Sequence, residues 1–274
     1  MTLLELIRAA IKEDMPAGDV TTEALALKPR QGRARLKAKE DIVMSGAMAF
    51  EQTMLSLEPN CKVKWHFEEG EAILKNQIIC TVEGDLMQIL KAERVALNFL
   101  GHLSGIATFT RRFVTAVAGT KTKVLDTRKT TPGFRELEKK AVVHGGGVNH
   151  RMNLSTAILI KDNHISVMGG IDAAVDRVRE HSPLAIEVEA RTLDEVKQAV
   201  NKKVARILLD NMDNDTLKKA RELVPTTIET EASGNMNLER VRSVADIGID
   251  FISVGALTHS APCADVSLIF DWED

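Results

Sequence analysis

From residue 123 onward, short apolar runs alternate with stretches of helical spacing. The apolar runs are residues 124–125, 158–160, 185–188, 207–209, 227–230 and 251–254. Helical spacing falls near residues 172–180, 193–200, 215–223 and 238–245. Apolar runs of this length, separated by amphipathic helices, predict parallel strands joined by right-handed crossovers. The pattern therefore predicts an α/β fold, either an open doubly wound sheet or an incomplete α/β barrel, and we favour the barrel.

The residues that close these predicted strands are spaced by about one βα unit each. They are Lys161, Glu189, Asp210, Glu231 and Gly255, with spacings of 28, 21, 21 and 24 residues. No Gly-x-Gly-x-x-Gly follows a strand, which argues against a dinucleotide-binding sheet. Ligands of such barrels bind at the C-terminal ends of the strands, so these positions are the first place to look for a site.

The first third of the chain has a different pattern. Residues 33–39 and 63–67 alternate apolar with polar positions, and residues 77–82 form another strand, which predicts a small, mostly antiparallel α+β unit. Helices are predicted at residues 2–13, 48–57 and 86–103, with a break at Gly101 and Gly105 before helix resumes at 106–117. On this reading Arg94 is an intrahelical partner of Glu93.

Composition narrows the function classes. The chain has 274 residues, 44% of them hydrophobic, and a net charge of -3, so no overall field attracts nucleic acid. Tyr is absent, which leaves few aromatic platforms for stacking bases. The three cysteines have no metal-type spacing, and neither a signal peptide nor a membrane-spanning run is recognisable. A cytoplasmic enzyme without nucleic-acid or membrane partners is expected.

The segment 124–165 concentrates cations at predicted strand ends. The cations are Arg128, Lys129, His150, Arg151 and Lys161. A solvated basic loop is the ordinary explanation for such a run, but these cations are interleaved with rigid turn residues such as Pro132 and Gly133. Because clustered cations repel one another, we expect a ligand with several negative charges.

Later strand ends carry acids and then small residues. Glu189 and Asp210 close middle strands, with Glu187 and Glu231 nearby, and Ser233-Gly234-Asn235 and Gly255-Ala256 follow the last two strands. Small residues allow backbone N–H groups to approach a phosphate. The order predicts a ligand with a carboxylate-rich part, a hydroxylated or metal-bound middle and a phosphate tail.

Several motifs resemble the quinolinate phosphoribosyltransferase family (carboxylating nicotinate-nucleotide pyrophosphorylases), which are type II phosphoribosyltransferases. They are Asp-Thr-Arg-Lys-Thr-Thr-Pro-Gly at 126–133, Gly-Gly-Gly-x-Asn-His-Arg at 145–151, Lys-Asp-Asn-His at 161–164, Glu-Ala-Ser-Gly-Asn at 231–235 and Gly-x-Leu-Thr-His-Ser at 255–260. Matches at 13–22 and 93–98 extend the resemblance over nearly the whole chain, and Phe134 and His144 depart mildly from the usual pattern.

The resemblance implies a fold and a reaction. The fold is an N-terminal α/β sandwich domain, taken as residues 1–106, followed by a seven-stranded α/β barrel at 107–264, with the tail 265–274 a candidate to pack on the sandwich. The reaction transfers phosphoribosyl from 5-phosphoribosyl 1-diphosphate to quinolinate with decarboxylation, yielding nicotinate mononucleotide, CO2 and diphosphate for NAD biosynthesis. Homodimers are implied, and dimer-based hexamers occur as higher oligomers.

The resemblance also implies roles for single residues. Arg128, His150, Arg151 and Lys161 would bind the quinolinate carboxylates, with Thr127 and Lys129 beside the phosphoribosyl diphosphate. Glu189 and Asp210 would face the ribose and Mg2+, directly or through water or substrate, and no organic cofactor is implied. The 5′-phosphate region would be held by Ser233, Gly234, Asn235, Gly255, Ala256 and His259. Arg94 would be donated across the dimer interface. Lys129, Lys161, Glu189 and Asp210 are the expected catalytic residues.

Two other functions are compatible with this fold. One is a paralogue associated with molybdenum transport, and the other is a non-catalytic barrel that binds phosphate or dicarboxylate. The intact Asn-His-Arg and Lys-Asp-Asn-His motifs favour the transferase.

Overall fold

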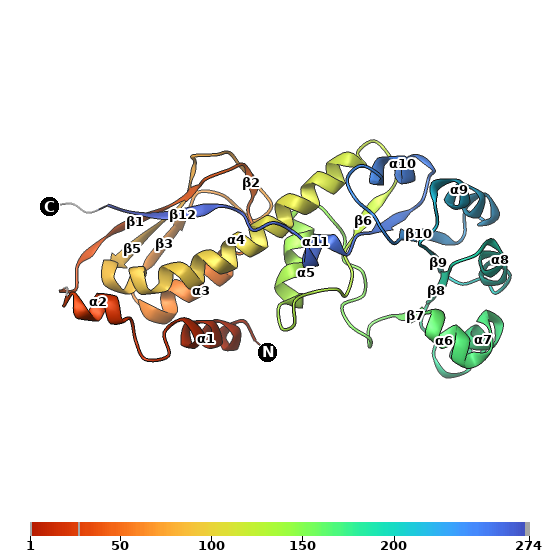
Figure 1. Cartoon of the computed structure of the whole chain (residues 1–274), viewed down its shortest axis with the longest axis horizontal. Coiled ribbons are helices and arrows are strands. Elements are labelled where there is room, and N and C mark those ends of the chain that lie inside the picture. Colours follow the sequence, from red (N-terminus) through yellow and green to blue (C-terminus); the bar gives the residue numbers. More distant parts are fainter. Residues whose placement is uncertain (1, 27, 272–274) are drawn as a thin grey trace. The chain divides into compact units, whose positions relative to one another are not determined.

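The computed structural model describes residues 2–26 and 28–271, which divide into two compact units (Figure 1). The first unit comprises the chain up to Arg111, residues 131–146 and the chain from Ser260 onward. The second comprises residues 112–130 and 147–259. The domains expected from the sequence, 1–106 and 107–264, do not coincide with these contact-based units and stay a prediction.

An antiparallel sheet organises the first unit. Its strands are ordered β12–β1–β5–β3, with bounds β1 (Gln31–Ala38), β3 (Lys62–Trp65), β5 (Ile78–Asp85) and β12 (Val266–Asp271). A two-stranded ribbon pairs β2 (Ile42–Val43) with β4 (Ala72–Ile73). The alternation in β1 buries Ala34 and Leu36 fully and leaves Arg33 and Arg35 to pair with Glu83 and Asp271 on neighbouring strands. The final three residues of the chain lie outside the described part.

Helices accompany this sheet in the first unit. They are α1 (Leu3–Asp14), α2 (Val20–Ala24), α3 (Ala47–Leu57), α4 (Leu86–Ala116) and α5 (Arg135–His144). Helices α3 and α4 lie against the sheet (Figure 1). Their side chains, among them Phe50 and Leu97, pack with Leu36 of β1 in one hydrophobic cluster that closes the core. Helix α5 joins the unit through hydrogen bonds between His102 and Glu138 and from Arg111 to the Gly145 carbonyl, each 2.9 Å long.

Helix α4 corrects the predicted break at Gly101 and Gly105. It runs unbroken for 31 residues. Both glycines lie where residues 262–264 cross the helix: a Cβ on Gly105 would lie 2.1 Å from the Pro262 carbonyl oxygen, and the Ala264 N–H donates to the Gly101 carbonyl at 2.9 Å. The glycines therefore serve close packing of two backbones, a use that sequence alone does not distinguish from a helix break.

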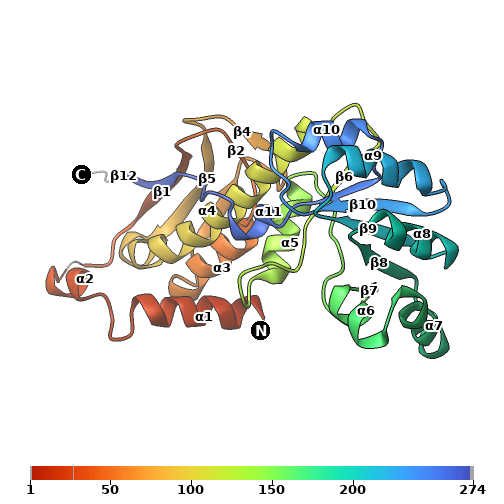
Figure 2. The ribbon, with the colours of Figure 1, turned by 45° about the vertical axis from the view of Figure 1, so that its right-hand side comes forward.

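A six-stranded parallel sheet organises the second unit (Figure 2). Its order is β6–β11–β10–β9–β8–β7, with bounds β6 (Lys123–Leu125), β7 (Ile158–Ile160), β8 (Ile186–Ala190), β9 (Arg206–Asp210), β10 (Glu229–Ser233) and β11 (Phe251–Ser253). Val148 adds one parallel bridge to Leu125 at the β6 edge. The six strands confirm the predicted α/β class, while the seventh barrel strand stays a prediction.

Helices follow the strands of this sheet. They are α6 (Asp162–Met168), α7 (Ile171–His181), α8 (Leu193–Asn201), α9 (Asn214–Leu223), α10 (Val241–Asp246) and α11 (Ala256–His259). Four of them, α7 to α10, lie where helical spacing predicted them, while α6 and α11 were not predicted. Helices α7, α8 and α9 line the outside of the sheet (Figure 1). None of the helices in the described ranges has the length and apolar character needed to cross a membrane.

Two strand positions differ from the prediction. Strand β8 extends to Ala190, and β10 runs from Glu229 to Ser233, so Glu231 lies inside its strand and Ser233 closes it. The predicted strands, 185–188 and 227–230, ended just before Glu189 and Glu231. In the structure Glu187 and Glu189 alternate with buried Val188, which places both carboxylates on the same face of the sheet.

Candidate active site

The C-terminal edge of the parallel sheet gathers the predicted cations that follow β6 and precede β7. Arg128 lies in the loop after β6 and Arg151 in the segment before β7, and both are half-buried. Partial burial and then the neighbouring Arg128 charge lower the pKa of Arg151. Arg151 Nη1 donates to the Ala157 carbonyl at 3.1 Å, which holds its side chain. Two guanidinium groups that repel each other make a site that a ligand carboxylate stabilises.

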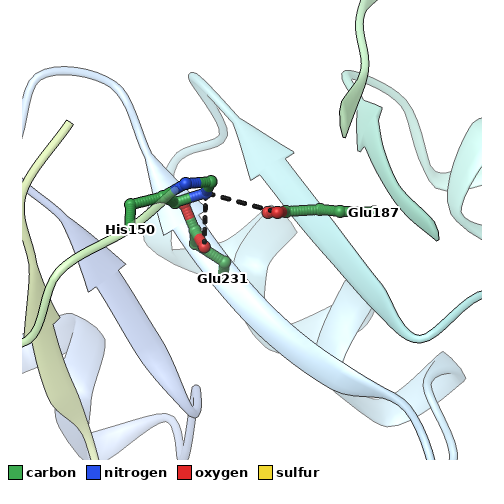
Figure 3. Close-up of side chains that lie close together, drawn as sticks. All are labelled: His150, Glu187 and Glu231. Carbon is green, nitrogen blue, oxygen red and sulfur yellow. Dashed lines mark ion pairs between the residues drawn. The ribbon is translucent and has the colours of Figure 1, made fainter. Parts of the chain in front are cut away.

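His150 lies beneath these cations, and its contacts point into the sheet. Its backbone N–H donates to the buried Asp126 carboxylate at 2.8 Å. Its Nε2 lies 3.2 Å from Glu187 Oε2 and 3.6 Å from Glu231 Oε2 (Figure 3). Burial raises the pKa of Glu187. Burial, and then the adjacent Glu187 charge, raise the pKa of Glu231 to about 7, although His150 and other partners favour its charged form.

Lys161, Glu189 and Asp210 meet at one place on the edge. Lys161 Nζ lies 3.4 Å from Glu189 Oε2. Arg191, which the sequence analysis did not single out, lies 3.5 Å from both Glu189 and Asp210 and 2.7 Å from Asp162. The Arg191 guanidinium thus reaches Glu189 on β8 and Asp210 on β9. The oxygens of these two carboxylates face the same position, which suits a cation.

Gly234 and Asn235, which follow β10, adopt the left-handed backbone conformation that glycine and asparagine tolerate best. Gly234 has φ +93°, and a Cβ there would lie 2.2 Å from Asn211 Oδ1. Asn211 and Asn235 are also left-handed, and the Asn235 amide donates to Asn211 at 3.4 Å. The Asn211 N–H donates to the Ser233 carbonyl. These contacts hold the segments that follow β9 and β10 closely against each other.

A second group of predicted residues meets around the loop after β6. The Lys129 N–H donates to Thr127 Oγ1 at 3.0 Å, and the Lys129 carbonyl accepts from Thr258 Oγ1 at 2.7 Å. A Cβ on Gly255 would lie 3.1 Å from Lys129 Cδ and 3.2 Å from His259 Nε2, so both side chains approach the bare backbone that precedes α11. Ala256 begins that short helix. Lys129 is exposed and able to reach a ligand.

Arg94 lies exposed on α4 in the first unit. Among the described residues it has no recorded hydrogen bond or ion pair, so the local pairing with Glu93 is not seen as a salt bridge. Burial raises the pKa of Glu93, and Arg94 opposes this effect. Its predicted role across a dimer interface stays a prediction.

Among the described residues, one group of side chains lies close enough to hold a metal ion. The donor atoms of His150, Glu187 and Glu231 are within 4.8 Å of one another. Glu189 and Asp210 offer oxygen ligands of the type that Mg2+ prefers, and both also lie 3.5 Å from Arg191.

Several side chains that were not predicted as site residues also contact the site, although Asp126 was noted as the first residue of a motif. Asp126, Arg191, Arg206 and Ser253 each contact a predicted residue or the carboxylates beside one. Arg206 begins β9, and its guanidinium stacks on the Phe251 ring at 4.0 Å. A signal for the inward carboxylates did exist, because acids alternate with apolar residues in Ile-Glu-Val-Glu-Ala at 186–190.

Sequence comparisons match two family models and several curated relatives along most of the chain. Family models described as quinolinate phosphoribosyl transferase, N-terminal and C-terminal domains, match residues 19–104 and 106–269. A probable carboxylating nicotinate-nucleotide pyrophosphorylase of Synechocystis sp. is 42% identical, covering 94% of this chain and 89% of the relative. A chloroplastic enzyme of that name from Arabidopsis thaliana is 41% identical, covering 99% and 83%.

Solved structures agree as well. The nicotinate-nucleotide pyrophosphorylase of Francisella tularensis superposes with a TM-score of 0.94 at 36% identity, covering 98% of this chain and 96% of that one. That of Ehrlichia chaffeensis also has a TM-score of 0.94, at 37% identity and 99% coverage of both chains. With both family models matched along one chain, and cations, carboxylates and small residues collected at one sheet edge, this protein belongs to the quinolinate phosphoribosyltransferase family.

Proposed function

We propose that this protein transfers the phosphoribosyl group of 5-phosphoribosyl 1-diphosphate to quinolinate. The pyridine nitrogen bonds to C1 of the sugar as diphosphate leaves, and the C2 carboxylate then leaves as CO2 while the ring carbon takes up a proton. The products are nicotinate mononucleotide, CO2 and diphosphate. The reaction serves NAD biosynthesis. The observation that carries this proposal is the series of cations, acids and small residues along one sheet edge in a chain of this family.

The cationic end of the series suits the dicarboxylate. The Arg128 charge lowers the pKa of Arg151, so these two guanidinium groups are close together. Lys161 follows β7, is half-exposed and pairs with Glu189. Charge-assisted hydrogen bonds to carboxylates are roughly twice as strong as neutral ones. His150 would support this set from the sheet side, because its ring nitrogens face the Arg151 backbone and Glu187. The pyridine nitrogen is unprotonated near neutral pH, so no strong base is needed.

The acidic middle suits the sugar and the leaving group. Positive charge develops on the ribose as the bond to diphosphate breaks, and the Glu189 and Asp210 carboxylates are placed to stabilise it. These two residues would also hold Mg2+, which stabilises the negative charge of diphosphate when bound. Lys129 would lie beside the diphosphate with Thr127. The turn at 233–235 and the segment 255–259 would hold the 5′-phosphate.

The remaining assignments extend this proposal. Homodimers, or hexamers built from them, would complete each site with the Arg94 of a neighbouring subunit. No organic cofactor enters the reaction. We place the enzyme in the cytoplasm, where its cysteines, all present as free thiols, would stay reduced.

Two other functions were considered from the sequence. A molybdenum-transport paralogue or a non-catalytic anion-binding barrel would share the fold, but the named relatives and solved structures are pyrophosphorylases or quinolinate phosphoribosyltransferases. The comparisons therefore favour the transferase.

Release of labelled CO2 tests the proposal directly. Quinolinate labelled in the C2 carboxyl group is incubated with the protein, with and without phosphoribosyl diphosphate and with and without Mg2+. We expect CO2 and nicotinate mononucleotide in equal amounts only when both additions are present. Tight quinolinate binding with no CO2 release would support the anion-binding barrel instead.

A further inference from the structure

Two carboxylates that the reaction does not use directly lie inside the sheet beneath the proposed quinolinate site. Glu187 extends from β8 and Glu231 from β10, and both point toward the His150 ring (Figure 3). Both residues are at least nine-tenths buried. Buried acids without a function are costly, so their contacts deserve an explanation.

The contacts of His150 determine how its ring is oriented. Its Nδ1 accepts a hydrogen bond from the Arg151 backbone N–H at 2.7 Å, so in the neutral ring the proton is on Nε2. Nε2 lies 3.2 Å from Glu187 Oε2, within reach of a hydrogen bond. The ring therefore links the backbone that carries Arg151 to a carboxylate in the sheet.

The carboxylates are themselves held from several strands. Ser253 Oγ on β11 donates to Glu231 Oε1, and Arg206 Nη1 on β9 donates to Glu231 Oε2 at 3.2 Å. Glu231 Oε2 lies 3.6 Å from His150 Nε2. Strands β8, β9, β10 and β11 thus support one imidazole, and a rigid support of this kind is what a precisely placed ligand contact requires.

We propose that Glu187 and Glu231 are positioning residues for quinolinate, which act through His150 to hold the segment that carries Arg151. The two carboxylates face Nε2 of the imidazole and orient the ring. On its other side, Nδ1 accepts the hydrogen bond from the Arg151 backbone N–H. Neither carboxylate touches the substrate. This inference rests on the proposed function, since it concerns the same binding site.

A metal ion is the main competing explanation for this cluster. One nitrogen and two carboxylates within 4.8 Å of one another also match a transition-metal site. The direct bonds from Ser253 and Arg206 to Glu231 already satisfy one of these carboxylates without a metal. The two explanations differ in metal content, which is measured on the purified protein.

Kinetics of paired variants test the positioning role. Glu187→Met keeps the side-chain length but removes both oxygens, while Glu187→Gln retains an oxygen that accepts from Nε2. We expect Glu187→Met to raise KM for quinolinate by about tenfold or more, with KM for phosphoribosyl diphosphate changed by less than about twofold. Glu187→Gln should recover most of the loss, and Glu231→Met should resemble Glu187→Met.

The control is Glu229→Gln. Glu229 lies on the same strand as Glu231 and binds the same Arg206, at 2.7 Å, but is exposed. It should leave both KM values unchanged. Equal rises in both KM values, or equal behaviour of Glu187→Met and Glu187→Gln, would reduce the carboxylates to a structural role and overturn the proposal.

A spectroscopic measurement tests the tautomer of the His150 ring without an enzyme assay. In protein labelled with 15N-histidine, the His150 signals are assigned by their loss in His150→Asn. We expect the Nε2–H tautomer in the wild type and a mixture of tautomers in Glu187→Met. An unchanged His150 spectrum in Glu187→Met, or one equivalent of bound transition metal that this variant loses, would overturn the proposal. Failure of the wild type to release CO2 from quinolinate would instead overturn the proposed function, and the tautomer result would still stand.

Discussion

Replacing Lys161 with alanine separates ligand binding from stability. The Lys161 side chain is 47% exposed, and among the described residues it forms an ion pair with Glu189, with Nζ 3.4 Å from Oε2. The start of α6 depends instead on the Lys161 backbone, whose N–H donates to His164 Nδ1 at 3.0 Å. Lys161→Ala therefore keeps the helix start and removes the cation.

The two expected magnitudes differ widely. A half-exposed ion pair contributes roughly 0–1 kcal/mol, so the melting temperature should fall by less than about 4 °C. A charge-assisted hydrogen bond to a quinolinate carboxylate contributes about 1.5–3 kcal/mol, which corresponds to roughly a 10- to 100-fold loss of affinity. Arg151→Ala should weaken quinolinate binding in the same range.

Calorimetric titration with quinolinate alone measures the affinity without turnover. Lys197→Ala is a matched control, because Lys197 is an exposed lysine on α8 that pairs only with Asp194 among the described residues. Lys161→Ala should lose affinity for quinolinate far more than for phosphoribosyl diphosphate, and Lys197→Ala should lose neither. Quinolinate affinity within about twofold of the wild type would remove Lys161 from the site.

Three further predictions concern turnover, subunit exchange and pH. Glu189→Gln and Asp210→Asn should lower kcat more than they raise either KM, because their charges act on the developing sugar cation; a change confined to one KM would contradict this role. Mixing Arg94→Ala with Lys161→Ala subunits should restore about a quarter of wild-type activity if sites are shared across a dimer, and none if each chain uses its own Arg94. The pKa of Glu231 is raised by burial from 4.5 to about 7, so the folded state binds its proton more tightly than the unfolded state. The stabilisation from this proton is complete below about pH 4.5 and disappears as pH rises to about 7, an effect of up to about 3 kcal/mol. Denaturant titrations at pH 5 and pH 8 should therefore show a smaller loss of stability in Glu231→Gln than in the wild type, and equal losses would refute the assignment.

Much of the architecture could be predicted from local patterns. Strands β6, β7, β9 and β11 occur where short apolar runs were recognised, because outward-facing residues such as Ile207 and Leu209 must be buried against helices. Parallel strands also bring their C-terminal ends to one edge, so chain order alone placed Lys161, Glu189 and Asp210 together. The motifs at 126–133, 145–151 and 161–164 are sufficient to indicate the family.

Other features depended on distant parts of the chain. Gly101 and Gly105 had the composition of a helix break, and only the passage of residues 262–264 across α4 showed that they allow close packing. The inward direction of Glu231 followed from the register of β10 with its neighbours, which no local pattern determines.

By itself, the sequence determined the α/β class, the order of most elements and the kinds of side chain at the sheet edge, because burial periodicity and motif spacing are local properties of the chain. The tertiary structure alone decided that His150 rests on Glu187 and Glu231 and that Arg191 joins Glu189 to Asp210. His150 is 37 residues from Glu187 and 81 from Glu231, and Arg191 is 19 residues from Asp210. Such partners are determined by the order and register of the strands, which no nearest-neighbour preference encodes.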